Sequence, residues 1–157
     1  MSVGLIYTGG TVGHRPSAGG LEREVRGLRS FMALLRERLS PAYWPKVVVA
    51  EARSVKMSEN RVPSDWGELA RAIDRQVWER MDGVVLVHGT DTLIYTACAM
   101  SELLRGVPIP VVLTGSRIPL VRPETDAVQN LAHAFRVAQE GKRPGVWIVF
   151  AGGGDRP

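Results

Sequence analysis

Apolar residues follow two alternating patterns along this chain. Short apolar runs rich in β-branched residues, typical of buried strands, alternate with stretches whose apolar residues recur every three or four positions, typical of amphipathic helices. The runs predict five strands, at residues 3–7, 47–50, 83–87, 111–113 and 146–150. The predicted helices between them are marked by Val25, Leu28, Met32, Leu35 and Leu39, by Trp66, Leu69, Ala70, Ile73 and Val77, by segment 93–105, and by Val128, Leu131, Ala132, Phe135 and Ala138. Continuously apolar strands separated by helices predict a three-layer, doubly wound α/β fold with a mostly parallel sheet.

Two connections between these elements carry predictions of their own. Ser64 precedes the second apolar stripe and is the expected N-cap of that helix. Residues 15–20, with the sequence Arg-Pro-Ser-Ala-Gly-Gly, are expected to form a flexible loop. A length of 157 residues supports one domain, which we expect to span residues 1–157.

Composition excludes several classes of protein. Hydrophobic residues make up 45% and charged residues 23%, the balance of a globular protein with a real core. We expect no membrane span, because the apolar runs are far shorter than the roughly 20 residues a span requires. We expect no secretory signal, because residues 1–5 are not a basic leader followed by a long apolar stretch. The lone cysteine, Cys98, fits a reducing, cytoplasmic location. Most basic residues are arginines interleaved with acids along the helices, which indicates solvated helix faces rather than a nucleic-acid site.

Residues able to carry chemistry follow each predicted strand. Segments rich in small, hydroxyl-bearing or acidic side chains are residues 8–11, Ser54 with 58–60, 88–92, 114–116 and 152–155. In an open parallel sheet, ligands bind beyond the carboxyl ends of the strands, so these five segments are expected to meet. Any one of them could equally be ordinary turn chemistry, but five at one edge indicate a site.

The residue types narrow the reaction. The three histidines, His14, His88 and His133, show no triad order, and His133 is expected on an exposed helix face. The chain lacks a nucleoside-triphosphate loop and a full dinucleotide fingerprint, and we expect neither a cofactor nor a metal. What remains is Thr11 after a glycine turn, with Thr90 and Asp91 at a helix start, where Thr90 could also serve as an N-cap. Hydroxyls with one carboxylate suit acyl transfer on a small polar substrate.

Three separated motifs resemble the bacterial L-asparaginase family, and most of all its cytoplasmic type I branch. The motifs are YTGGTVG at 7–13, HGTDT at 88–92 with YTA at 95–97, and TGSRIPL at 114–120 with Asp126 and Asn130-Leu131 following; PSDW at 63–66 resembles a family helix start. Together they cover essentially the whole chain and correspond to the family's large N-terminal domain only. The resemblance implies a flavodoxin-like sheet and hydrolysis of L-asparagine, with L-glutamine as a second possible substrate.

The resemblance also implies roles for individual residues. Thr11 matches the nucleophile that forms an acyl-enzyme, and Thr90 and Asp91 match the second catalytic threonine and the acid that pairs with the substrate's α-ammonium. The implied substrate contacts are Ser58 for the α-carboxylate, Glu59, Gly10, Gly89, and Ser116 near the side-chain amide. Because family sites lie at subunit contacts, the resemblance implies a homo-oligomer.

Two departures from the family pattern keep other functions open. Leu21 stands about where the family has a loop tyrosine, and the family's catalytic lysine would follow the fifth strand beyond Pro157, so that Lys142 does not match it. We also expect the family's small C-terminal domain to be absent, and the protein to be a short-chain enzyme. The alternatives are a catalytically weak amino-acid-binding domain, an amidotransferase subunit, or a nucleotide-binding module of the same fold.

Overall fold

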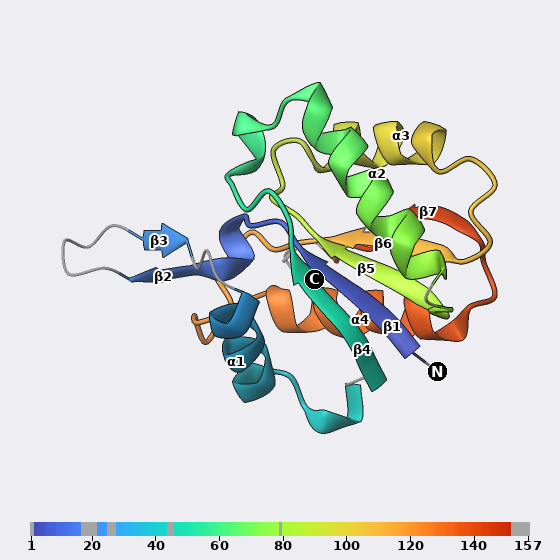
Figure 1. The fold of residues 1–157 in the computed structure, drawn as a ribbon. Coiled ribbons are helices and arrows are strands. Elements are labelled where there is room, and N and C mark those ends of the chain that lie inside the picture. Colours follow the sequence, from blue (N-terminus) through green and yellow to red (C-terminus); the bar gives the residue numbers. More distant parts are fainter. Residues whose placement is uncertain (1, 17–21, 25–27, 44–45, 79, 152–157) are drawn as a thin grey trace.

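A five-stranded parallel sheet forms the centre of the molecule in the computed structural model, which describes residues 2–16, 22–24, 28–43, 46–78 and 80–151 (Figure 1). The strands stand in the order β4-β1-β5-β6-β7. Their bounds are β1 Ser2–Tyr7, β4 Lys46–Ala52, β5 Gly83–Val87, β6 Pro110–Thr114 and β7 Gly145–Ile148. All four neighbouring pairs are parallel, as the continuously apolar strands predicted.

Helices cover both faces of this sheet. The α-helices of the described residues are α1 Leu28–Arg38, α2 Pro63–Trp78, α3 Leu93–Leu103 and α4 Ala127–Glu140. Helices α1 and α4 pack against one face, and α2 and α3 pack against the other (Figure 1). The three-layer, doubly wound α/β prediction is therefore confirmed.

Strand β1 shows why the strands are apolar throughout. Val3, Leu5 and Tyr7 point into the core beneath α1 and α4, whereas Ile6 points into the core beneath α2 and α3. Successive side chains of a strand face opposite sides, so a strand with helices on both sides must be apolar at every position. The Tyr7 ring stacks on Phe31 of α1 with their centroids 4.2 Å apart, which fixes α1 over the carboxyl end of β1.

The structure corrects two predictions about connections. Helix α2 begins at Pro63, and the carboxylate of Asp65 accepts a hydrogen bond from the Val62 N–H at 2.9 Å, so Ser64 is not the N-cap. Arg15 and Pro16 belong to a strand, β2 His14–Pro16, which pairs antiparallel with β3 Glu22–Glu24. The rest of the expected loop, residues 17–20, lies outside the described residues, as do Val25, Leu21 and the side chain of Val77.

Three short 3-10 helices complete the described structure: η1 Thr11–Gly13, η2 Pro41–Tyr43 and η3 Ser58–Asn60. Two of them, η1 and η3, follow β1 and β4 at the carboxyl edge of the sheet. Within the described ranges, no helix has the length and apolar character needed to cross a membrane.

Candidate active site

The strand order places a crevice between β1 and β5. In chain order the sheet reads 2-1-3-4-5, so the chain winds in opposite directions on either side of the β1–β5 pair. Loops that leave two strands at such a reversal separate to opposite faces of the sheet, and ligands of doubly wound proteins bind there. The two loops concerned are residues 8–11 after β1 and residues 88–92 after β5.

Glycines bring these two loops, and the turn after β4, into backbone contact. Gly10 has a φ of 90°, and a Cβ atom there would lie 2.5 Å from the Cα of Gly89. A Cβ on Gly89 would in turn lie 2.6 Å from the Oγ of Ser58. Only glycine fits at either position, because side chains essentially never make contacts this short. The three predicted site residues Gly10, Gly89 and Ser58 therefore lie together.

The same contact bounds the separation of the two candidate threonines. Gly10 and Gly89 have Cα atoms within about 4 Å of each other, and each is bonded to a threonine whose Cα lies about 3.8 Å further on. The Cα atoms of Thr11 and Thr90 are therefore no more than about 12 Å apart. Both threonines are partly exposed, so one small ligand could contact both.

Ser58 and Asp91 are joined by a hydrogen bond. The Ser58 hydroxyl donates to Asp91 Oδ2 at 3.1 Å, and the Thr92 hydroxyl donates to the Ser58 carbonyl at 2.9 Å. Ser58 is buried, whereas Asp91 is exposed and can receive a ligand. Thr92, not Thr90, is the N-cap of α3, so the purely structural interpretation of Thr90 as that cap is wrong.

The remaining predicted contacts, Glu59 and Ser116, differ in their surroundings. Glu59 lies in η3 and is exposed, beside the buried Ser58. Ser116 is buried, and its hydroxyl has no hydrogen-bond partner among the described residues. Its neighbour Gly115 packs against the β5 loop, since a Cβ there would lie 2.2 Å from the His88 carbonyl oxygen. Ser116 is thus held at the same edge as the other three segments.

Asp126 and Asn130 fix the loop that carries Ser116. The Asp126 carboxylate accepts hydrogen bonds from the N–H groups of Arg117 and Ile118 at 3.0 to 3.1 Å. The Asn130 amide donates to the Gly115 carbonyl at 3.0 Å and accepts from the Ala151 N–H at 2.8 Å. Asn130 therefore links the end of β6 to the chain that follows β7.

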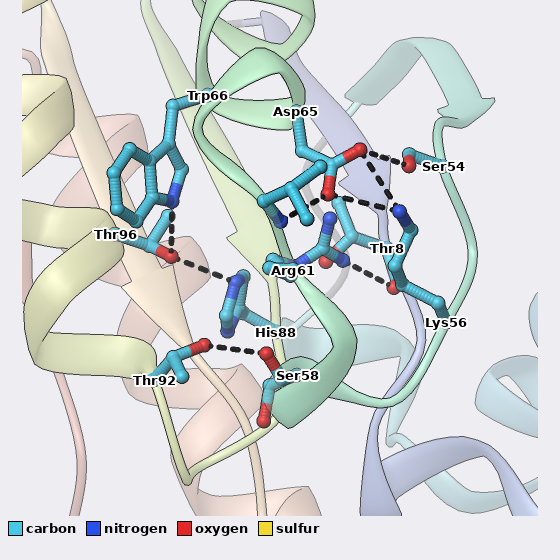
Figure 2. A network of polar contacts seen from close by, with 11 residues as sticks. Thr8, Ser54, Lys56, Ser58, Arg61, Asp65, Trp66, His88, Thr92 and Thr96 are labelled. Atoms are coloured by element: carbon cyan, nitrogen blue, oxygen red, sulfur yellow. Dashed lines mark hydrogen bonds and ion pairs between the residues drawn. The ribbon is translucent and has the colours of Figure 1, made fainter.

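A chain of hydrogen bonds that sequence reasoning missed supports the β5 loop from behind. Trp66 Nε1 donates to Thr96 Oγ1 at 3.1 Å, and Thr96 Oγ1 lies 3.0 Å from His88 Nε2 (Figure 2). His88 Nδ1 lies 2.7 Å from the Gly89 carbonyl oxygen and must donate to it, since a carbonyl can only accept. In the neutral ring Nε2 then accepts from the Thr96 hydroxyl. The hydrogen bonds are therefore donated in one direction, from Trp66 through Thr96 and His88 to the Gly89 carbonyl.

His88 is a neutral group inside the protein. Burial lowers its pKa to about 4, the hydrogen bond to the Gly89 carbonyl works against that shift, and the positive charge of Arg61 adds to it. His88 is fully buried, so it is not a ligand-facing base but a support for the Gly89 backbone. His133 is exposed on α4, as predicted, and His14 contacts the sulfur of Met57 at 3.2 Å.

A second network supports the turn that carries Ser58. The carboxylate of Asp65 accepts hydrogen bonds from Ser54 Oγ at 2.9 Å, from Lys56 Nζ at 2.9 to 3.0 Å and from the Val62 N–H (Figure 2). Burial alone would raise the pKa of Asp65, but the Val62, Lys56 and Ser54 hydrogen bonds outweigh it and lower that pKa. Asp65 is therefore an anion that ties both ends of the loop together. The sequence shows these residue types but not that they meet.

The described residues at the carboxyl edge of the sheet form no metal-ligand cluster. Among the described residues, no three histidine, cysteine, aspartate or glutamate side chains gather as a metal site would require. A cavity of about 540 Å³ lies elsewhere, between α2 and the α3–β6 connection, and is lined mainly by apolar atoms. The hydroxyl and carboxylate groups at the carboxyl ends of β1, β4, β5 and β6 remain the candidate site.

Comparison with known proteins gives consistent matches. The family model described as "Asparaginase, N-terminal" matches residues 2–153. L-asparaginase 1 of Escherichia coli is 36% identical over 137 residues, covering 87% of this chain and 40% of that protein. A glutamyl-tRNA(Gln) amidotransferase subunit of Haloquadratum walsbyi is 36% identical over 141 residues, covering 87% of this chain and 30% of that protein. The solved structure of the thermostable L-asparaginase from Thermococcus kodakarensis is similar with a TM-score of 0.80 and 32% identity, over 96% of this chain and 44% of that one. The chain thus spans less than half the length of these relatives.

Proposed function

The chain belongs to the asparaginase family and matches its N-terminal domain, and from this premise we propose that it carries the nucleophile and substrate contacts of an amidohydrolase that converts L-asparagine to L-aspartate and ammonia. One observation carries the proposal. The Gly10, Gly89 and Ser58 segments meet in backbone contact at the β1–β5 reversal, which brings the motif around Thr11 to the motif around Thr90.

Thr11 is the proposed nucleophile. Its hydroxyl oxygen attacks the side-chain amide carbon of asparagine, the hydroxyl proton passes to the amide nitrogen, and the C–N bond breaks to release ammonia and leave an aspartyl ester. Water then adds to the ester and releases L-aspartate and the free hydroxyl. Thr11 is partly exposed in η1, directly after the glycine that reaches the β5 loop, so its hydroxyl is accessible to a small substrate.

Thr90 and Asp91 are the other proposed catalytic residues. The exposed carboxylate of Asp91 suits an α-ammonium group, and the hydrogen bond from Ser58 fixes one of its oxygens. Ser58 is proposed to face the α-carboxylate of the substrate and Glu59 to be a further substrate contact, with Gly10 and Gly89 forming the floor. The Ser116 hydroxyl, which has no partner among the described residues, supports a role near the side-chain amide, because a buried hydroxyl in that state costs free energy unless a ligand satisfies it.

The test is ammonia release from L-asparagine. We expect Thr11→Ala to abolish turnover with an unchanged circular dichroism spectrum, whereas Thr11→Ser, which retains a hydroxyl, keeps measurable turnover. Ser101→Ala serves as a hydroxyl control, because Ser101 is exposed on α3 and its hydroxyl donates within its own helix, to the Cys98 carbonyl. Undiminished ammonia release by Thr11→Ala would exclude Thr11 as the nucleophile.

A second candidate function is an amino-acid-binding domain or amidotransferase subunit. The similarity to the H. walsbyi amidotransferase favours it, because that relative covers as much of this chain as the E. coli asparaginase does. Calorimetry separates the two candidates. L-aspartate binding without any asparagine turnover would favour the second, and turnover that depends on Thr11 would favour the first.

Domain organisation, assembly and location are proposals of the same kind. We propose that residues 1–157 fold as one domain and that the active protein is a cytoplasmic homo-oligomer, as the resemblance to the type I branch implies. Analytical ultracentrifugation run alongside activity measurements tests the assembly. A monomer that keeps full activity at every dilution contradicts it.

A further inference from the structure

Arg61 lies between two segments of the proposed site. It directly follows η3, where its N–H donates to the Ser58 carbonyl at 3.1 Å. Its guanidinium turns the other way, and Nη2 donates to the carbonyl oxygen of Thr8 at 2.7 Å (Figure 2). The other guanidinium nitrogens, Nε and Nη1, are buried. One residue thus contacts both the Ser58 turn and the end of β1.

The Thr8 carbonyl is an anchored point. Thr8 is fully buried, and both its N–H and its hydroxyl donate to the Val87 carbonyl of β5, at 3.0 and 2.8 Å. Its own carbonyl accepts from Arg61 and from the Lys56 N–H at 3.2 Å. Thr8 is followed within three residues by Thr11, so a bond to its carbonyl fixes where the turn toward Thr11 begins.

Arg61 also brings a permanent positive charge. A guanidinium stays protonated at all ordinary pH values, and its field is strong where water is excluded. The field reaches the end of β5, since Arg61 contributes to the low pKa of His88. The neighbouring ammonium of Lys56 forms an ion pair with the Asp65 carboxylate at 2.9 Å.

We propose that Arg61 is a positioning residue for asparagine hydrolysis, which ties the Ser58 turn to the 8–11 turn and holds its positive charge behind both. The proposal rests on the proposed function, because it assigns the substrate-binding turn and the nucleophile turn that Arg61 connects. A fixed positive charge there stabilises negative charge that develops on the substrate's amide oxygen during attack. A loss of alignment between the two turns lowers the rate, because small displacements of reacting groups have large effects.

Three variants distinguish the effect of the Arg61–Thr8 hydrogen bond from the effect of the Arg61 charge. Arg61→Met removes both with little change in volume, Arg61→Lys keeps the charge, and Arg71→Met makes the same chemical change at an exposed position of α2 as a matched control. We expect Arg61→Met to lower kcat/KM at least about tenfold with kcat itself reduced, Arg61→Lys to recover part of that loss, and Arg71→Met to match the wild type.

The titration of His88, followed by NMR of its imidazole nitrogens, reports the charge at position 61, and Arg61→Lys is the control for packing because it alters the side chain but keeps the charge. Arg61→Met should raise the pKa of His88 above its value of about 4, while Arg61→Lys and Arg71→Met leave it in place. If Arg61→Met does not fold, Arg61→Gln takes its place, because Gln keeps an N–H donor but carries no charge.

The outcomes distinguish this proposal from the proposed function. A wild-type chain without asparagine turnover refutes the proposed function. In that case the His88 titration still tests the charge of Arg61, and the affinity for L-aspartate still tests whether Arg61 holds the Ser58 turn and the 8–11 turn together. A kcat/KM of Arg61→Met within twofold of the wild type overturns the positioning role. An unchanged His88 titration in the neutral variant overturns the placement of the charge.

Discussion

Lowering the pH from 7 to 5 should destabilise this protein through one residue, His88. The buried imidazole has a pKa of about 4 in the folded protein, against about 6.5 in an unfolded chain. Between these two values the unfolded state binds a proton that the folded state does not. Stability from the neutral ring is therefore fully present above about pH 6.5 and is lost progressively as the pH falls toward 4.

The magnitude follows from the two pKa values. Integrating proton uptake between pH 7 and pH 5 gives a loss of roughly 2 kcal/mol in the free energy of unfolding. For a domain of this length that corresponds to a fall in Tm of roughly 4 to 8 °C. The full loss on reaching pH 4 approaches about 3 kcal/mol.

Urea unfolding at pH 7, 6 and 5 measures this loss, with the midpoint and the slope fitted separately. His88→Asn is the test variant, because its amide can still donate to the Gly89 carbonyl but does not titrate. His133→Asn is the matched control, since His133 is exposed on α4. The reasoning is refuted if His88→Asn loses as much stability as the wild type over this range, or if NMR places the His88 pKa near 6.5.

Three further predictions concern the supports of the site. Thr96→Val should lower the free energy of unfolding by about 2 kcal/mol or more, because the partly buried Trp66 indole N–H and the buried His88 imidazole each lose their partner; Thr96→Ser should cost less than about 1 kcal/mol in the same urea titration. Gly10→Ala, whose Cβ would meet the Gly89 backbone, should lower Tm more than Gly106→Ala, where φ is also positive but no atom of the described residues lies within 4 Å; equal shifts would contradict the close approach. Asp65→Asn should cost about 1 to 3 kcal/mol at pH 7 and flatten the loss of stability below about pH 4, because the lowered pKa of this carboxyl stabilises the fold only while it is ionised; a parallel acid-unfolding curve would disprove this.

Pattern alone predicted the elements well and their details less well. Strand β5 was predicted with its observed bounds, because every residue of a doubly covered strand must be apolar. The α1 stripe missed Phe31 and Leu34, which are buried, and included Met32, which is only partly buried. A spacing of three and four residues fits several rotations of the helix about its own axis. Only the packing partner determines which of these rotations, and so which side chains, are buried.

Part of the candidate site could likewise be predicted from the sequence and part could not. Glycines and hydroxyls at strand ends were visible in the sequence, because turn chemistry and ligand contact require those residue types locally. The support behind them was not: Trp66, Thr96 and His88 come from α2, α3 and the end of β5, and no local rule pairs them. The sequence placed His88 in a motif after β5 but did not show that its side chain is buried.

The central position of β1 has a consequence for synthesis of the protein. Strand β1 pairs with β5 in the register Val3↔Gly83 to Tyr7↔Val87, so this partner is made about 80 residues after β1. At a translation rate of roughly 5 to 20 residues per second, the backbone N–H and C=O groups of β1 that face β5 stay without that partner for several seconds. The glycine turn after β1 cannot meet Gly89 before β5 has been made, so the candidate site forms only at that point.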